Sequence, residues 1–205
     1  MTTAAQLPAR ADIPVEETWA LDSIFATPVD WEEACRKLEG LLPELAAFQG
    51  RLAEGPAVLL AAIQKLEEAG TLLGKVSVYA SNAASVDTFD QAATARMGQA
   101  RSLGARAGAA MAFFDPELMS IGFDTLKEWM HSTPELAFFA HYVDRLEKRS
   151  PHVRSTEVEE VLALAGDPFS GAFNSFNMLT NADLTFHPAT DSTGAELEIG
   201  QSSIG

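Results

Sequence analysis

The stretch HYVDRLEKRSPH, from His141 to His152, places two histidines close to an aspartate and a glutamate. Imidazoles and carboxylates are common zinc ligands and general bases. A helical zinc site needs two histidines four residues apart, so that both imidazoles project from one face. The histidines of this chain are instead separated by 10, 11 and 35 residues, at His131, His141, His152 and His187. This spacing excludes a helical zinc pair, and we expect no metal ligand in the chain.

Two smaller groups of residues do not change this interpretation. Glu128 and His131 form a Glu-x-x-His fragment, which di-iron helical bundles require twice, whereas this chain contains it once. His141 and Asp144 share a helical face, but Arg145 stands one turn from His141 and offers the aspartate a competing partner. We therefore interpret the stretch as a solvated helix end with ion pairs, followed by a linker.

Nucleophilic catalysis has no better support. Cys35, the single cysteine, has no histidine or basic cluster nearby in the sequence to lower its pKa, and it lies at helical spacing from Trp31 and Leu38. We expect it to be a core residue. A Gly-x-Ser-x-Gly elbow is missing, and the glycines fall inside predicted helices rather than in a phosphate-binding loop. We expect no catalytic and no cofactor-binding residue in this chain.

Three arginines in one predicted helix are the remaining candidates for a binding site. Arg96, Arg101 and Arg106 are spaced by five residues, and each step turns the side chain by about 140° around a helix. They therefore do not form a single patch, although one pair could join other charges in a cleft.

The charge balance excludes several classes of partner. The chain has 14 Lys and Arg against 29 Asp and Glu, a formal charge of −15, which disfavours binding to nucleic acid or to an anionic membrane. One cysteine forms no internal disulfide, and the N-terminus lacks the apolar core of a signal peptide. The most apolar long window, 91–114, carries three arginines. We expect a cytoplasmic protein without a transmembrane segment.

Helix start signals dominate the rest of the sequence. Proline follows a plausible cap, as at a first helical position, in four pairs: Gly55-Pro56, Asp115-Pro116, Thr133-Pro134 and Asp167-Pro168. Asp30 with Glu33, and Thr156 with Glu159, fit the capping-box pattern. The predicted helices span about 30–53 with a kink or break at Pro43, 56–86, 89–114, 116–120, 124–132, 134–149, 155–165 and 168–181.

The predicted fold is mainly α. Helices 56–86 and 89–114 form a long antiparallel hairpin, in which Gly98, Gly104 and Gly108 would allow close packing of helices. Shorter helices complete a helical lobe over 16–182, after a flexible N-terminus over 1–15. The alternation on both sides of the Asp-Ser-Thr-Gly turn predicts a short C-terminal β-hairpin within 183–205.

Four segments occur in the order and spacing of a known family: WALDSIF, FFDPELMSI, TPELAFFAHYVDRLEKRSPHVRSTEVEEVLA and LTNADLTFHPATDSTGAELEIG. Together they resemble the N-terminal region of oligoendopeptidase F, a zinc metallopeptidase related to thimet oligopeptidase. The resemblance covers about 19–199 of this chain.

The resemblance implies the lobe of a helical, cytosolic enzyme that cleaves short peptides inside a deep channel. The family's zinc motif, His-Glu-x-x-His, and its later glutamate ligand lie in a catalytic lobe that this chain does not contain. None of those residues has a counterpart here. We expect a lobe that walls and gates the channel, is inactive alone, and has the catalytic lobe and short peptides as partners. The 183–205 hairpin would lead towards the missing lobe.

Two other interpretations remain open. The chain could be a freestanding helical module that presents a groove to a partner helix or peptide. It could also be a ferritin-like metal bundle, which would contain stoichiometric iron or manganese.

Overall fold

The computed structural model describes residues 12–86, 90–152, 171–172, 175–176, 179 and 187–197. The described residues are mainly helical, as the sequence predicts. Contacts divide the chain into a helical unit, Pro8–Ser150, and a second unit made of Met1–Leu7 with Pro151–Gly205. This division falls inside the predicted lobe of 16–182, and the predicted domain boundaries stay predictions.

The first long helix, α1, spans Pro28–Ala46 and follows two short 3-10 turns, η2 (Val15–Glu17) and η3 (Leu21–Ser23). Its capping box pairs Thr27 with Asp30: the Asp30 N–H donates to Thr27 Oγ1 at 3.2 Å, and the Thr27 N–H donates to Asp30 Oδ2 at 2.9 Å. The predicted box of Asp30 with Glu33 is therefore wrong, because Asp30 is the third helical residue and not the cap. Pro43 lies within α1 and does not end it.

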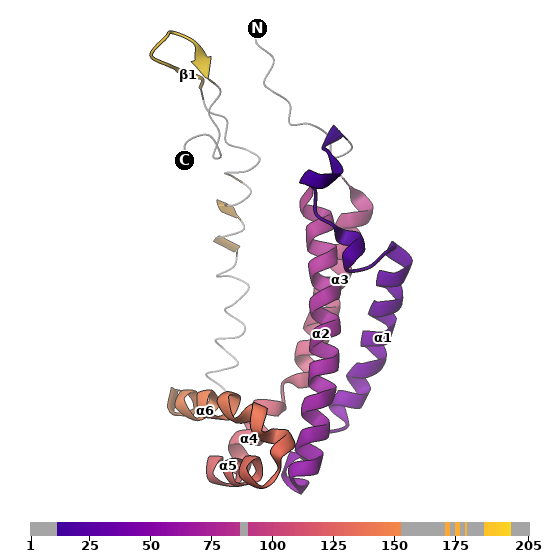
Figure 1. Cartoon of the computed structure of the whole chain (residues 1–205), viewed down its shortest axis with the longest axis vertical. Coiled ribbons are helices and arrows are strands. Elements are labelled where there is room, and N and C mark those ends of the chain that lie inside the picture. Colours follow the sequence, from indigo (N-terminus) through magenta and orange to yellow (C-terminus); the bar gives the residue numbers. More distant parts are fainter. Residues whose placement is uncertain are drawn as a thin grey trace. The chain divides into compact units, whose positions relative to one another are not determined.

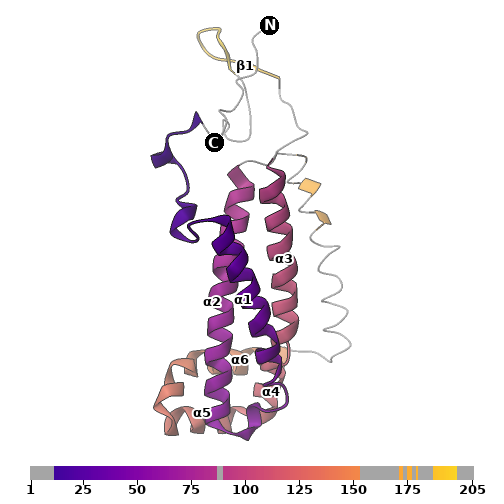
Figure 2. The ribbon, with the colours of Figure 1, turned by 90° about the vertical axis from the view of Figure 1, so that its right-hand side faces the viewer.

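Helices α2 (Pro56–Val86) and α3 (Gln91–Met111) form the predicted long antiparallel hairpin, and α1 packs against both of them (Figure 1, Figure 2). Pro56 is the first residue of α2, as predicted. Asp90 caps α3, since its Oδ1 accepts from the N–H groups of Ala92 at 2.8 Å and Ala93 at 3.0 Å. This cap makes α3 start at Gln91, later than the predicted residue 89.

The core of the three-helix bundle is built around Trp31, which is fully buried. Its Nε1 donates to the carbonyl oxygen of Val76 at 3.0 Å, and its ring stacks on Tyr79 with centroids 6.4 Å apart. Helix α3 contributes mainly small residues to this cluster, including Ala100 and Ala107 with Leu103. Because α3 presents alanines on this face, the bulkier residues of α1 and α2 fill the space between the helices.

The glycines of α3 do not provide the predicted close packing. A Cβ atom added at Gly98 or Gly108 would meet no atom within 4 Å, and one at Gly104 would make only an ordinary contact of 3.8 Å with Leu73. The prediction is wrong because the buried positions on α3 are occupied by alanines and Leu103, whereas Gly98 and Gly108 are exposed and Gly104 has space for a side-chain carbon beside Leu73.

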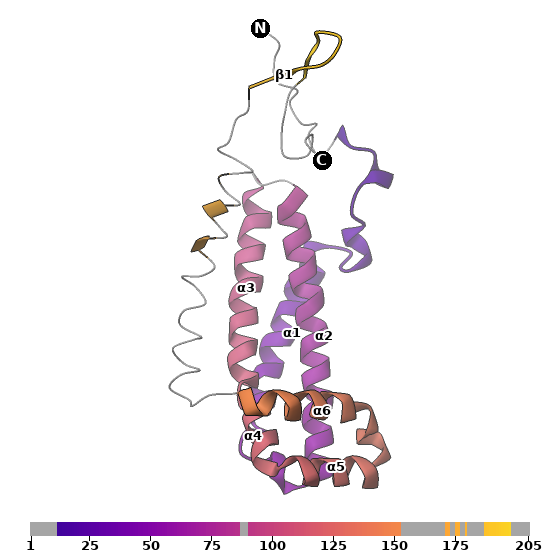
Figure 3. The same ribbon diagram turned by 90° about the vertical axis from the view of Figure 1, so that its left-hand side faces the viewer.

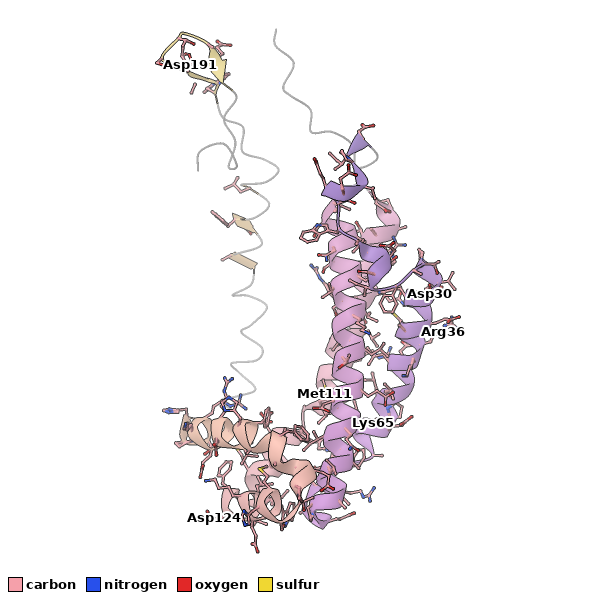
Figure 4. All side chains as sticks on the ribbon, viewed as in Figure 1. Asp30, Arg36, Lys65, Met111, Asp124 and Asp191 are labelled. Atoms are coloured by element: carbon pink, nitrogen blue, oxygen red, sulfur yellow. The ribbon has the colours of Figure 1, made fainter. Side chains whose placement is uncertain are left out.

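Ion pairs join α1 to α2 along their exposed edge. Lys65 of α2, labelled in Figure 4, lies 2.9 Å from Glu44 of α1 and 3.1 Å from Glu68 of its own helix. Glu68 also pairs with Lys37 of α1 at 3.0 Å. These partners raise the pKa of Lys65 and lower that of Glu68. The pairs are partly exposed to solvent, so we expect them to fix the register of the two helices more than to stabilise the fold.

Short helices cover the end of the bundle where α2 begins (Figure 3). They are η4 (Leu52–Glu54), α4 (Phe114–Ile121), α5 (Phe123–Ser132), η5 (Pro134–Phe139) and α6 (Ala140–Arg149). Their apolar side chains and the first turns of α2 form a second buried cluster, which includes Leu59, Leu118, Leu126 and Leu136. The predicted helix 134–149 is thus a 3-10 segment followed by α6.

Helix α4 begins earlier than predicted. Its first residue is Phe114, so Asp115 lies inside the first turn and does not cap the helix. Pro116 is then the third residue, where a backbone N–H would have no helical partner, and a proline is tolerated there.

The predicted C-terminal hairpin is present in the described residues. Strands β1 (Ala189–Thr190) and β2 (Glu196–Leu197) are antiparallel, with Ala189 opposite Leu197. Asp191 Oδ1 holds the turn by accepting from Thr193 N–H at 2.8 Å and Ala195 N–H at 2.9 Å. Gly194 has a φ of +86°, a conformation that glycine adopts without strain.

Two predicted helices, 155–165 and 168–181, lie outside the described residues, except for 171–172, 175–176 and 179 of the second helix. The predicted capping pair of Thr156 with Glu159 and the pair Asp167-Pro168 also lie outside them. Among the helices that are described, none combines the length and the apolar composition needed to cross a bilayer.

Candidate functional site

The histidines do not come together into a ligand set. His131 lies on α5 and His141 on α6, and both side chains are exposed. His152 ends the 3-10 turn η6 (Ser150–His152), and His187 precedes β1. Across the residues that the structure describes, no three His, Cys, Asp or Glu side chains lie close enough to hold a metal ion. Glu128 and His131 are exposed on α5 without a second such pair beside them.

Cys35 is a core residue, as predicted, with 2% of its surface exposed. Burial raises the pKa of its thiol to about 11, and the negative charges of Glu39 and Glu32 add to the rise. The side chain is therefore a protonated thiol at neutral pH, which is not a nucleophile.

The three arginines of α3 have separate environments, which agrees with the prediction that they form no single patch. Arg106 Nη1 lies 2.6 Å from Glu39 Oε1 and joins α3 to α1. Arg101 lies beside Met97 at the edge of a hollow of about 300 Å³ between α2 and α3. Arg96 Nε is buried without a hydrogen-bond partner in the described structure. None of these positions combines several polar groups into a site.

The chemically richest surface lies on α6 and the end of η5. A hollow of about 680 Å³ is lined there by aromatic and basic side chains: Phe138, His141, Tyr142, Arg145, Leu146, Lys148 and Arg149. We call this surface the α6 groove. It contains most of the stretch HYVDRLEKR, which the sequence analysis interpreted as a solvated helix end.

The sequence of α6 sorts its side chains onto three faces. Val143 and Leu146 are buried in the second cluster. Asp144 and Glu147 lie on the side of α5, where Glu147 Oε2 is 2.7 Å from Lys127 Nζ. The hydrogen bond to Glu147 raises the pKa of Lys127, and the negative charge of Asp144 adds to the rise. The basic residues share the remaining face, since Arg145 stands four residues from His141 and from Arg149 and three from Lys148. Among the described residues, the lining of the groove therefore carries cations without a carboxylate.

Asp115 of α4 organises one end of the groove. It accepts hydrogen bonds from the Tyr142 hydroxyl and from Arg149 Nη2. The Tyr142 ring stacks on Phe139 with centroids 4.6 Å apart. Burial, and then the hydrogen bond to Asp115, raise the pKa of Tyr142 to about 12, so the phenol stays protonated at neutral pH. Asp115 thereby fixes Tyr142 and offsets the charge of Arg149.

Arg145 and Lys148 remain without an acidic partner in the described part of the chain. The competing pair of Asp144 with Arg145 that the sequence suggested does not form, because the two side chains occupy different faces of α6. The sequence analysis missed the groove. Sorting the charges of 138–149 by helical angle would have revealed its basic face, although not the hollow beside it.

Residues 117–186 match the family model described as Oligopeptidase F. Oligopeptidase PepF of Bacillus subtilis is 31% identical over 196 residues, which cover 96% of this chain and 29% of that protein. Group B oligopeptidase PepB of Streptococcus agalactiae is 28% identical over 190 residues, which cover 93% of this chain and 32% of that protein.

Solved structures agree with the sequence comparison. The crystal structure of oligoendopeptidase-F from Enterococcus faecium superposes with a TM-score of 0.68 at 26% identity, over 86% of this chain and 35% of that one. A putative peptidase from Chlamydophila abortus shares the fold with a TM-score of 0.64 at 22% identity. The chain spans about a third of the length of the relatives that it matches.

Proposed function

We propose, on the premise that this chain corresponds in sequence and fold to the N-terminal region of the oligoendopeptidase F family, that it is the N-terminal lobe of a cytoplasmic peptidase acting on short peptides. The lobe walls and gates the substrate channel, and it is inactive alone. Catalysis belongs to a separate catalytic lobe of the same protein. The observation that carries the proposal is the match of nearly the whole chain to less than a third of Bacillus subtilis oligopeptidase PepF.

The chemistry of the described residues supports the assignment of catalysis to another lobe. Zinc, which the family resemblance implies, has no suitable donor set among the described residues, because no three histidine, cysteine, aspartate or glutamate side chains there lie close enough together. Any zinc would be bound by residues outside this chain. The proposed role of the lobe is to hold the peptide in place and to keep folded proteins out.

The lobe assignment is tested by measuring peptide hydrolysis. The 205-residue chain with added zinc should leave a quenched fluorescent peptide intact. A chimera in which this chain replaces the matching part of Bacillus subtilis oligopeptidase PepF should cleave the peptide, whereas the PepF remainder alone serves as the control. Zinc-dependent turnover by the 205-residue chain itself would contradict the assignment.

The gating part of the proposal needs a second substrate. We expect the chimera to cleave the short peptide but to leave the same sequence intact when it lies within a folded protein. Equal cleavage of both substrates would show that the lobe does not restrict access.

The α6 groove also favours a second candidate, a freestanding module that binds peptides. The coding sequence downstream of Gly205 separates the two. A reading frame that continues into His-Glu-x-x-His supports the peptidase lobe, and a stop codon supports the module.

A further inference from the structure

We infer that the α6 groove binds carboxylate groups of peptides, with Arg145 and Lys148 as the anion-binding side chains and Phe138 and Tyr142 as its apolar wall. This inference rests on the proposed function, because it names the class of peptide that the lobe holds. Acidic peptides, and peptides with a free C-terminal carboxylate, are the expected ligands.

The groove is positively charged although the chain as a whole is negatively charged. The chain as a whole carries a formal charge of −15, yet the described residues that line the groove include His141, Arg145, Lys148 and Arg149 and no acidic residue. Arg149 is already paired with Asp115, so its charge is satisfied within the protein. Arg145 and Lys148 have no carboxylate partner among the described residues and are available to an incoming anion.

The favourable interaction of cations with the C-terminal end of a helix explains only part of the positive charge of the groove. Cations in the last turn of a helix interact favourably with its carbonyl groups, which explains Lys148 and Arg149 without any ligand. Arg145 lies one turn earlier, outside the range of that effect. It is therefore the residue whose position points most clearly to an external anion.

The groove also combines exposed aromatic side chains with a planar guanidinium group. Phe138 is 55% exposed and Tyr142 is 41% exposed, unlike Phe139, which is 9% exposed beneath them. The protonated Tyr142 hydroxyl is held by Asp115, so the ring has a fixed position. A guanidinium group binds a carboxylate through two parallel hydrogen bonds, while aromatic surface packs against the adjoining peptide.

The size and the charge of the molecule favour a short peptide over a polyanion. A hollow of about 680 Å³ lies in the range of small-ligand sites and has room for only a few residues. The surrounding negative charge would repel a nucleic acid, because a polyanion extends beyond the groove.

Calorimetric titration of the full chain tests the inference. The two probes are a short acidic peptide with a free C-terminus and the same peptide with glutamines for the acids and a C-terminal amide. We expect the acidic peptide alone to bind, and more weakly as the salt concentration rises. Arg145→Gln should lower its affinity about tenfold, in line with the loss of a charge-assisted hydrogen bond.

Lys75→Gln is the matched control, because it removes one exposed positive charge on α2, away from the groove. It should leave the affinity within about twofold, as expected for a distant, screened charge. Arg145 is exposed, so the variant should fold, and circular dichroism checks this. Equal binding of both peptides, no binding of either, or an unchanged affinity in Arg145→Gln would overturn the inference. The titration measures binding and not turnover. A negative result would therefore contradict this inference but would not affect the hydrolysis test of the proposed function.

Discussion

At the residue scale, Tyr142 shows how a neighbouring carboxylate controls a side chain of the groove. Its phenol donates to Asp115 and is partly buried, and both effects disfavour the phenolate. The neutral hydroxyl, rather than a charged oxygen, therefore faces the basic side chains. The same contact ties α6 to α4, so one hydrogen bond serves both the groove and the fold.

We predict that Tyr142 titrates at about pH 12, above its ordinary value of 10.0. In a Tyr79→Phe background it is the only tyrosine, since the chain contains two, and tyrosinate absorbance reports its ionisation directly. Adding Asp115→Asn should lower the pKa of Tyr142 towards its ordinary value, because the hydrogen bond to a carboxylate and its negative charge are lost. The pKa should stay above the ordinary value, since burial is the larger cause. An unchanged pKa in Asp115→Asn would contradict the contact.

The same shift has a consequence for stability. The pKa of Tyr142 is higher in the folded state than in the unfolded state, so its contribution is fully present below about pH 10 and is lost as the pH rises to about 12. Urea unfolding at pH 9 and pH 11.5 measures this effect. Between these pH values the free energy of unfolding should fall more for the Tyr79→Phe variant than for a Tyr79→Phe/Tyr142→Phe double variant.

At the element scale, α3 separates two kinds of small residue. Ala107 is buried against the bundle, whereas Gly98 is exposed and has free space around it. Both residues are small, but only the alanine is small because a neighbouring helix requires it. The glycine only weakens the helix by its backbone freedom.

These two positions should respond to substitution with opposite signs. Ala107→Leu should destabilise the protein by about 1–3 kcal/mol, because the larger side chain has no room between the helices. Gly98→Ala should stabilise it by about 0.5–1 kcal/mol, because alanine restricts the unfolded backbone and favours the helix. Urea unfolding followed by circular dichroism measures both. A stabilising Ala107→Leu, or a destabilising Gly98→Ala, would show that the packing of α3 differs from that described.

At the scale of the whole helical unit, α2 links the two buried clusters. Leu59 and Ile63 belong to the cluster under the short helices, and Val76 and Tyr79 belong to the three-helix bundle. Leu66 packs against both. Since one continuous helix carries residues of each cluster, loss of either cluster removes the support of the other.

We therefore predict that residues Pro8–Ser150 unfold in one cooperative step. Trp31 reports on the bundle and Trp129 on the second cluster, so each can be kept as the only tryptophan by replacing the other two with phenylalanine. Within each variant, the fluorescence transition in urea should coincide with the transition measured by circular dichroism. Leu126→Ala, in the second cluster, should shift the Trp31 transition as well, by about 2–5 kcal/mol. A shift confined to Trp129 would indicate two independent subdomains.

Much of the architecture was predictable because it depends on local signals. The bounds of α2 and the pairing of α2 with α3 follow from Pro56 and from apolar periodicity, and the C-terminal turn follows from its Asp-Ser-Thr-Gly sequence. The start of α1 was misplaced because Thr27 and Asp30 fit a capping box as well as Asp30 and Glu33 do. Local patterns do not decide between two overlapping caps.

The sequence by itself determined that the chain is helical, that Cys35 is buried and that no histidine pair has the spacing of a helical zinc site, because composition, periodicity and spacing are properties of the linear chain. Only the tertiary structure decided which side chains of α6 meet. The contact of Asp115 with Tyr142 and Arg149 joins α4 to α6, and it leaves Arg145 and Lys148 without an acidic partner among the described residues. Such a contact depends on the angle at which two helices pack, and that angle is set by the buried cluster beneath them rather than by either segment alone.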